Sequence, residues 1–405
     1  MKRALTFFGY GKTTKAMAKK YGASNFYDDS ITSYFQDKDG NHIYPASEFI
    51  SENSTCEIPS PGIAPNNPLI LRAKNLISEY DFYVDQMPYT IWISGTNGKT
   101  TTTQMMTDLL SDKGALSGGN IGTPLAELDE KAPIWILETS SFSLHYINKA
   151  SPNIYVLLPI TPDHISWHGG LEEYKQAKLK PLSTMKDKEI VILPNALLDT
   201  PTNAFKIGYN DAEDLAKYFD IDTTKLNYKG AFLLDAVIAL AVDKILYDRT
   251  QYEKINNFKL DPHRQEKLND EHGRVWVNDS KATNIDATLA ALKSYDTYQN
   301  IYIILGGDDK GVELETLFHE LVKLNVKIFT IGKNEIRLIE LAKKYMIPFL
   351  ECHTLHNAIE EIDKIHGTHT VAMLSPAAAS LDQFNSYSDR GDQFKEAVKD
   401  LRKNL

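Results

Sequence analysis

The sequence predicts an α/β protein built on mostly parallel sheets. Short apolar runs alternate with helical spacing along most of the 405 residues, and this alternation is typical of strands joined by crossover helices. Many of the runs end in polar or charged residues, as strands of an open parallel sheet do next to a binding site. The length also suits two to four separate cores. We therefore expect three domains, at residues 1–88, 89–260 and 261–405.

The composition of the chain argues against several classes of protein. The formal net charge is −10, which argues against nonspecific binding to nucleic acid or to an anionic membrane. Cys56 and Cys352 lie far apart and lack zinc-site spacing, as expected in a reducing compartment. The first ten residues lack a signal-peptide pattern, and the longest apolar run, 231–242, is too short to span a membrane. We expect a cytoplasmic protein without a nucleic-acid or membrane partner, and a buried helix at 231–242.

The predicted first domain opens with a glycine turn. An apolar run leads into Gly9 and Gly11, and helical spacing follows. A strand, a Gly-x-Gly turn and a helix make up half of a dinucleotide-binding fingerprint, although Thr14 replaces the third glycine. We expect a Rossmann-like domain here. The Pro/Gly-rich loop at 60–70 should lead into a polar helix that reaches Tyr83.

The segment GTNGKTT is the strongest local signal in the chain. A β-rich run at 90–94 enters it, two glycines bend it, and a helix opens at Lys99. In such a loop the backbone N–H groups face an anion, the lysine reaches the β- and γ-phosphates, and the first threonine hydroxyl can bind Mg²⁺. Ile93 replaces the first glycine of the usual P-loop motif. The residues expected to bind nucleotide phosphates are Gly95, Thr96, Asn97, Gly98, Lys99, Thr100 and Thr101.

Polar residues follow the central strand-like runs. One run ends at Glu138, where a carboxylate on a doubly wound sheet would meet phosphate-bound Mg²⁺. A second run ends just before Asp163 and His164, and a helix beginning at Leu171 carries Lys178. Taken singly, such side chains are more often structural or solvated. Whether these side chains form a functional site therefore depends on whether they occur together with the other motifs.

The last third repeats the alternation and predicts a second Rossmann-like domain. Its four strand-like runs end in small or charged residues, at Asp279, Asp308, Gly332 and Ser375. Just before this domain, Pro262 breaks the helical pattern. His263 and Arg264 can then face a cleft.

Several motifs together resemble those of the Mur ligases, in the same order and over nearly the whole chain. They are GTNGKTTT (95–102), GNIGTP (119–124), ETSSFSL (138–144), TPDHISWHGGLEEYKQAK (161–178), PHRQE (262–266), NDSKATN (278–284), GGDDKG (306–311) and SPAAASLDQFNSYSDRGDQF (375–394). The PHRQE, DSKATN and SPAAASLDQF segments are most similar to those of the members that add D-glutamate.

The resemblance implies an N-terminal Rossmann-like domain that binds UDP, a central P-loop ATPase domain and a C-terminal domain that receives D-glutamate. ATP would phosphorylate the terminal carboxylate of UDP-N-acetylmuramoyl-L-alanine, and the amine of D-glutamate would attack the acyl phosphate. A free carboxylate is a poor electrophile, and phosphorylation supplies it with a leaving group; cations must meet the charge that develops. The resemblance also implies two Mg²⁺ ions, a monomer and a role in cytoplasmic peptidoglycan precursor synthesis.

For the nucleotide and the metals, the resemblance implies the following roles. Lys99 holds the β- and γ-phosphates, Thr100 and Glu138 hold one Mg²⁺, and His164 holds the second. Lys178 matches a carbamylated lysine, whose carboxylate places a negative charge beside the metals, whereas a free ammonium would be repelled there.

The remaining implied roles concern the substrates. His263 and Arg264 face the acyl phosphate and the nucleotide, and Asp279 contacts the nucleotide ribose; Lys99, Lys178, His263 and Lys281 are the expected catalytic residues. Gly11, Lys12, Thr13 and Asn120 contact the UDP substrate. Two lysines with hydroxyl and backbone donors can pair both carboxylates of D-glutamate. The residues of that pocket are Lys281, Thr283, Lys310, Ser380, Leu381 and Tyr387.

Three other functions fit parts of this pattern. Another amide ligase of the superfamily would add L-alanine, a diamino acid or a glutamate to folate. A non-catalytic nucleotide-binding regulator would keep the phosphate loop but need not keep His164 and Lys178. A P-loop GTPase fits less well, because no NKxD-type segment follows the loop.

Overall fold

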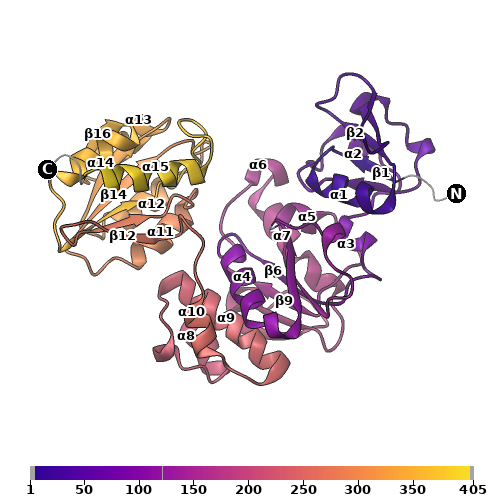
Figure 1. Cartoon of the computed structure of the whole chain (residues 1–405), viewed down its shortest axis with the longest axis horizontal. Helices are drawn as coiled ribbons and strands as arrows, with labels where there is room; N and C mark the ends of the chain where they lie inside the picture. Colours follow the sequence, from indigo (N-terminus) through magenta and orange to yellow (C-terminus); the bar gives the residue numbers. More distant parts are fainter. Residues whose placement is uncertain (1–4, 121, 402–405) are drawn as a thin grey trace. The chain divides into compact units, whose positions relative to one another are not determined.

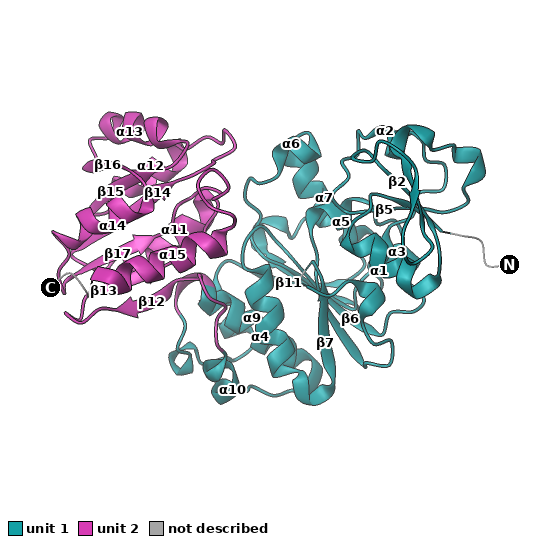
Figure 2. Ribbon diagram, turned by 45° about the horizontal axis from the view of Figure 1, so that its top comes forward, with its two compact units in different colours: residues 1–228, 232–258 teal, residues 229–231, 259–405 magenta. Residues whose placement is uncertain are grey.

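The computed structural model describes residues 5–120 and 122–401. Its three sheets are mostly parallel and confirm the predicted α/β fold class. The chain divides into two compact units, Met1–Tyr228 with Phe232–Phe258, and Lys229–Ala231 with Lys259–Leu405 (Figure 2). The first unit holds two sheets and the second unit holds one (Figure 1). The domain boundaries at 88 and 260 remain predictions.

The first sheet has the strand order β3-β4-β2-β1-β5, in which β3 is an antiparallel edge strand. Its strands are β1 (Thr6–Phe8), β2 (Asn25–Asp28), β3 (Phe35–Gln36), β4 (His42–Pro45) and β5 (Glu57–Pro59). Helix α1 (Lys12–Tyr21) joins β1 to β2. The turn before it needs a φ of 85° at Gly9, a conformation that glycine adopts without strain.

The predicted polar helix reaching Tyr83 is wrong. Two short helices, α2 (Pro68–Arg72) and α3 (Glu79–Phe82), occupy this segment. The backbone between them pairs with β5 instead, since Glu57 N–H donates to Asn75 O at 3.0 Å and Ile77 N–H donates to Glu57 O at 2.9 Å. These sheet-like bonds hold the segment extended and interrupt the helix.

The second sheet is fully parallel, with the order β11-β10-β9-β6-β8-β7. Its strands are β6 (Tyr89–Ser94), β7 (Ala115–Gly119), β8 (Ile134–Glu138), β9 (Ile154–Leu157), β10 (Ile190–Pro194) and β11 (Phe205–Tyr209). Every residue of β8 and β9 is buried, as expected for parallel strands covered on both faces.

The helices that accompany this sheet are α4 (Lys99–Leu109), α5 (Ser141–His145), α6 (Ile165–His168), α7 (Leu171–Thr184), α8 (Ala212–Tyr218), α9 (Gly230–Tyr247) and α10 (Tyr252–Asn257). Helices α4 and α9 lie side by side (Figures 1 and 2), and the Thr102 hydroxyl donates to Asp235 Oδ1 between them at 2.8 Å. Residues 235–243 of α9 are buried, which confirms the helix predicted at 231–242 and its burial from Asp235 onward, whereas Ala231 is exposed.

The third sheet has the order β12-β13-β17-β14-β15-β16, with β12 antiparallel to β13. Its strands are β12 (Glu266–Asn269), β13 (Val275–Asn278), β14 (Asn300–Gly306), β15 (Val326–Ile331), β16 (Phe349–His353) and β17 (Thr370–Leu374). One face packs on α11 (Ile285–Lys293), α12 (Glu315–Leu321) and α13 (Glu335–Lys344), and the other face packs on α14 (Leu355–Asp363) and α15 (Tyr387–Asp400). The four predicted strands are present, and β12 and β16 are additional.

Within the described residues, no helix is long and apolar enough to cross a membrane.

Candidate active site

The loop between β6 and α4 brings its backbone unusually close to neighbouring elements. Gly95 has a φ of 137° and Gly98 a φ of 85°. A Cβ at Gly95 would lie 2.4 Å from the Cβ of Leu158, and one at Gly98 would lie 2.7 Å from Asp235 Oδ1. No side chain caps the N-terminus of α4. A glycine loop that leads into such a helix end is suited to binding an anion.

The Lys99 side chain folds back over this loop. Its Nζ donates to Gly95 O at 2.9 Å and to Thr96 O at 2.7 Å. Thr96 is held in turn, because its hydroxyl donates to Thr161 O at 2.9 Å and lies 3.0 Å from the Tyr174 hydroxyl. Thr100 and Asn97 are half-buried in the same turn. The predicted phosphate-binding residues therefore form one continuous loop and helix start.

Glu138 lies at the carboxyl end of β8, in register with Ile93 of β6. Its Oε1 accepts a hydrogen bond from Asn120 Nδ2 at 2.6 Å. Its Oε2 is buried and has no hydrogen-bond partner within residues 5–120 and 122–401. A buried carboxylate oxygen without a donor is costly, and a hard divalent cation such as Mg²⁺ is a ligand that would satisfy it. The donor set at this position therefore fits a metal ion.

Lys178, on α7, is buried beside the same loop with an exposed fraction of 1%. Its Nζ donates to Gly95 O at 2.8 Å and lies 4.7 Å from the centre of the Tyr174 ring. Burial holds the pKa of Lys178 well below its usual range, and the charge of Lys99 lowers it further, against the opposite influence of Asp163 and Glu138. The environment thus favours an uncharged amine at Lys178.

His164 lies in the loop that follows β9, as predicted, and serves as the N-cap of α6 with a φ of 51°. Its Nε2 lies 3.5 Å from Asp163 Oδ2, and its ring centre lies 4.7 Å from that of Phe142. The imidazole is exposed. His168, four residues on, is buried beside Ser141 Oγ at 2.9 Å, and burial lowers its pKa to about 4.

A cavity of about 310 Å³ in the first unit brings several predicted substrate residues together. Lys12 and Thr13 from the start of α1 line it, and so does Asn120. The Lys12 ammonium donates to Gly122 O across it. Gly11 is the N-cap of α1. The volume lies within the range of small-molecule sites, about 300–1,000 Å³.

The loop that forms one wall of this cavity is held by aromatic side chains of the central sheet's helices. Trp167 Nε1 donates to Gly62 O at 3.0 Å, and the Tyr146 hydroxyl donates to Ile63 O at 2.6 Å. Gly62 lines the cavity together with Ser60 and Pro61. Sequence reasoning treated this Pro/Gly-rich segment as a plain loop and missed its place in the site.

In the second unit, a group of predicted residues surrounds His263. The His263 Nδ1 lies 3.0 Å from Asn278 Nδ2, and its Nε2 lies 3.8 Å from Asp392 Oδ1. Burial, with the charge of Lys395, lowers the pKa of His263. The backbone N–H of Lys281 donates to His263 O at 3.1 Å.

The side chains of Lys281 and Tyr387 come together next to this histidine. The Lys281 Nζ lies 5.3 Å from the centre of the Tyr387 ring, which lies 6.2 Å from that of His263. Burial, followed by the charge of Arg264, lowers the pKa of Lys281. Asp279 is buried and accepts from Ser375 Oγ at 2.7 Å; burial raises its pKa to about 7.

The other predicted D-glutamate residues lie on two paired loops. Asp308 and Ala379 exchange backbone hydrogen bonds at 2.9 and 3.0 Å, which sets the loop of Lys310 beside that of Ser380. Ser380 is buried, whereas Lys310, Leu381 and Thr283 are exposed. The Thr283 N–H donates to Lys281 O at 2.9 Å, whereas Lys310 and Leu381 make no hydrogen bond or ion pair with Lys281 among the described residues.

Arg390 joins the loops of this unit and was missed from the sequence. It is fully buried; its Nη2 donates to Ser280 O at 2.8 Å and its Nη1 donates to Ala378 O at 3.1 Å. Its Nε donates to Ser280 Oγ at 3.0 Å. The guanidinium therefore fixes the NDSKATN loop against the SPAAAS loop. The sequence feature that could have identified Arg390 is its position in the SYSDRGDQF part of the last motif.

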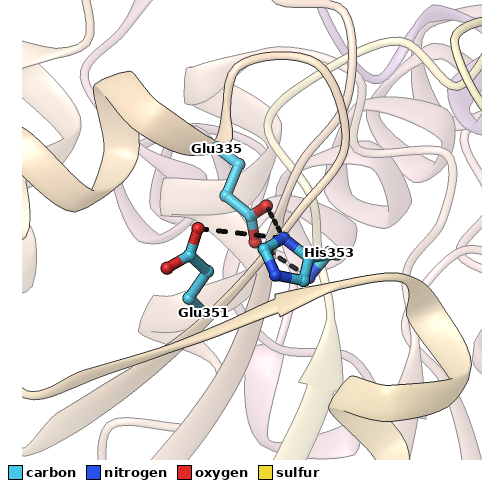
Figure 3. A group of neighbouring side chains, drawn as sticks. All are labelled: Glu335, Glu351 and His353. Atoms are coloured by element: carbon cyan, nitrogen blue, oxygen red, sulfur yellow. Dashed lines mark hydrogen bonds and ion pairs between the residues drawn. The ribbon is translucent and has the colours of Figure 1, made fainter.

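Glu335, Glu351 and His353 form a separate group of potential metal ligands (Figure 3). The Glu335 carboxylate already accepts from the Thr330 hydroxyl and from His353 N–H, both at 2.9 Å, and its Oε2 lies 2.7 Å from His353 Nδ1. Glu351 lies 3.8 Å from the same nitrogen. These interactions link β15, β16 and α13 to one another, and we assign the group a structural role.

Known proteins match this chain over nearly its whole length. Residues 93–231 match the Mur ligase middle domain. A UDP-N-acetylmuramoylalanine–D-glutamate ligase from Campylobacter jejuni is 51% identical over 97% of this chain and 99% of its own; one from Helicobacter pylori is 44% identical over the same shares. A MurF ligase from Thermotoga maritima, solved in complex with ADP, is 15% identical but has a TM-score of 0.60 over 95% of this chain and 96% of that one, which shows a shared fold. This chain therefore belongs to the Mur ligases, in the family of UDP-N-acetylmuramoylalanine–D-glutamate ligases.

Proposed function

We propose that this chain joins D-glutamate to UDP-N-acetylmuramoyl-L-alanine at the cost of ATP, as a monomeric cytoplasmic enzyme of peptidoglycan precursor synthesis. Residues 1–88 bind the UDP moiety, 89–260 bind ATP and 261–405 bind D-glutamate. The observation that carries the proposal is the arrangement around Gly95, whose carbonyl oxygen accepts from both Lys99 and Lys178.

Two ammonium groups on one buried carbonyl oxygen repel each other. Carbamylation of Lys178 would remove the conflict, because the neutral amine favoured by burial adds CO₂, releases a proton and becomes a carbamate anion. The new carboxylate lies in a region that already includes Lys99, Glu138 and Asp163. We therefore assign Lys178 as the carbamylated lysine of this family.

We assign the metal ligands from the match to the family motifs. Thr100 and Glu138 would hold one Mg²⁺, and His164 with the carbamate of Lys178 would hold the second. The ions supply charge neutralisation at the phosphates. The unpaired Oε2 of Glu138 supports the first assignment.

The reaction then proceeds in two steps. A carboxylate oxygen of the alanyl group attacks the γ-phosphorus of ATP and ADP leaves, with Lys99 and the loop N–H groups meeting the charge. The amine of D-glutamate attacks the acyl carbon, loses a proton and expels phosphate, giving the amide. His263 and Arg264 face the acyl phosphate, and Asp279 contacts the ribose.

The substrate residues divide between the two units. Lys12 and Thr13, at the start of α1, and Asn120 line the cavity for the UDP substrate, with Gly11 in the turn. Lys281 and Lys310 pair the carboxylates of D-glutamate, together with Thr283, Ser380, Leu381 and Tyr387. Burial and the charge of Arg264 lower the pKa of Lys281, against the opposite influence of Tyr387 and Asp261, and a substrate carboxylate would stabilise the charged ammonium.

An amino-acid panel tests the proposal. Phosphate release is measured with ATP, Mg²⁺ and UDP-N-acetylmuramoyl-L-alanine in the presence of D-glutamate, L-glutamate, L-alanine or L-lysine, and the product mass is determined. We expect release with D-glutamate alone and a product heavier by one glutamyl residue. Release with another amino acid would move the specificity elsewhere in the superfamily, and release independent of any amino acid would refute the ligase.

A further inference from the structure

Glu79 is a buried acid with an unused oxygen. It begins α3, directly after the N-cap Ser78, and has an exposed fraction of 7%. Its carboxyl receives a hydrogen bond from the backbone N–H of Leu125, in the short 3-10 helix η4 (Leu125–Glu127). Its Oε1 is buried and has no hydrogen-bond partner in the part of the chain that the structure describes. A buried polar atom of this kind needs a ligand or a water to satisfy it.

The surroundings of Glu79 supply space for such a ligand. Glu79 lines the cavity of about 310 Å³ that also contains Lys12, Thr13 and Asn120. It also lines a second cavity of about 10 Å³, between Ser78 and Tyr146, which has room for about one water molecule. The carboxyl group therefore lies at the wall between the proposed substrate site and a water-sized void.

The charge state of this acid decides what it can bind. Burial raises the pKa of Glu79 to about 7. Tyr80 and Tyr83 interact electrostatically with Glu79, Asp81 follows two residues later on α3, and Lys12 lines the same cavity from α1. An ionised carboxylate would repel an anionic nucleotide sugar, whereas a carboxylic acid has an O–H to donate.

We propose that Glu79 is a substrate-binding residue that acts as a neutral carboxylic acid and donates a hydrogen bond to an acceptor oxygen of the nucleotide sugar in the cavity. This inference rests on the proposed function. It adds a donor from α3 to those from α1 and from Asn120. It also explains why an acid without a cationic partner lines a site for an anion.

Two near-isosteric variants test the donor role. Glu79→Gln keeps a neutral N–H donor, and Glu79→Met removes it at similar length. We expect the Gln variant to keep the KM for UDP-N-acetylmuramoyl-L-alanine within about threefold of wild type, and the Met variant to raise it about tenfold, the effect of one lost hydrogen bond. The kcat and the KM values for ATP and D-glutamate should change little. Calorimetric titration with the UDP substrate alone should give the same ratio of Kd values.

Glu127→Met is the matched control, because Glu127 is an exposed acid on η4 next to Leu125. An unchanged KM in Glu79→Met, or a Gln variant as impaired as the Met variant, would overturn the inference. If Glu79→Met does not fold, Glu79→Ala replaces it with the same expectations. Wild-type turnover is measured first: its absence would refute the proposed function, whereas equal KM values in an active enzyme would refute the role of Glu79 alone.

Discussion

At the scale of single residues, the key feature is that Lys99 and Lys178 donate to the same carbonyl oxygen, that of Gly95. Lys99 comes from α4 and Lys178 from α7, so the loop between β6 and α4 collects two ammonium groups. Burial, together with this repulsion, depresses the pKa of Lys178. The depression supports the proposed carbamylation, because CO₂ reacts with the neutral amine.

Removing Lys178 should therefore remove catalysis. We expect Lys178→Ala to lower kcat by about 10²-fold or more, the usual effect of losing a group that organises charge in an active site. Added bicarbonate should not restore activity, because the variant has no amine to carbamylate. Steady-state phosphate release with and without bicarbonate measures both effects.

Lys175→Ala provides the control on the same helix, since Lys175 is half-buried and lies outside the proposed site. It should retain near wild-type kcat. Full activity of Lys178→Ala would contradict the carbamate role.

Sequence patterns located Lys99, Glu138 and Lys178 because each sits in a motif or directly after an apolar run. Glu79 has neither of these sequence features. It lies in a polar stretch where an acid would ordinarily be solvated, and its burial depends on Leu125 and on the loop around Pro61, both distant in sequence. Arg390 was missed for the same reason, because its partners lie on loops about 110 and 12 residues away.

At the scale of elements, the conformation of the β6–α4 loop depends on its glycines more than on any side chain. Gly95 has a φ of 137° and a neighbour, Leu158, at 2.4 Å from its would-be Cβ. Both the backbone conformation and the lack of space exclude larger residues. The backbone path of the loop also sets the position of Lys99, because the Lys99 Nζ donates to carbonyl oxygens of the loop itself.

We accordingly expect Gly95→Ala to disrupt the phosphate loop while the rest of the protein folds. The strain should be of the order of 1–3 kcal/mol, and the KM for ATP should rise by at least about tenfold. Equilibrium binding of ATP and thermal unfolding measure the two consequences. Gly367→Ala serves as control, since Gly367 has open space around its would-be Cβ and no positive φ, and it should behave as wild type. Unchanged ATP binding in Gly95→Ala would show that the loop tolerates a side chain.

Most elements could be predicted from the sequence because the buried strands are continuous apolar runs. The edge strand β12 reads EKLN with alternating burial, and β16 reads FLECH with one buried residue; neither resembles a core strand. The helix expected to reach Tyr83 is interrupted because residues 75–77 pair with β5. The helix and β16 were misjudged because they depend on pairing with distant residues, whereas β12 forms a local hairpin with β13 and was missed because its sequence is polar.

At the scale of the whole molecule, the chain consists of two compact units. The phosphate loop and the cavity of Lys12 and Asn120 belong to the first unit, and the group around His263, Lys281 and Tyr387 belongs to the second. The cavity gathers segments near residues 12, 60, 79, 120 and 140. No window of sequence contains these segments together, so the motifs predicted Lys12, Thr13 and Asn120 but neither the cavity nor the contributions of Glu79 and the 60–62 loop.

This division predicts different footprints for the ligands. ATP should slow amide hydrogen exchange mainly at 95–110 with a smaller effect around Asp279, and D-glutamate mainly at 280–284 and 375–387, because each ligand stabilises the elements that it binds. Hydrogen-exchange mass spectrometry with one ligand at a time measures this. Protection of 95–110 by D-glutamate alone would contradict the assignment of its pocket to the second unit.

The central claim is that ATP activates the substrate carboxylate as an acyl phosphate, and an oxygen label follows that step directly. UDP-N-acetylmuramoyl-L-alanine labelled with ¹⁸O in its terminal carboxylate is incubated with ATP, Mg²⁺ and D-glutamate, and the released phosphate is analysed by mass spectrometry. We predict one ¹⁸O in each phosphate, since the leaving phosphate carries away the attacking carboxylate oxygen. Unlabelled phosphate would mean that ATP is hydrolysed by water, and would contradict the proposed ligation.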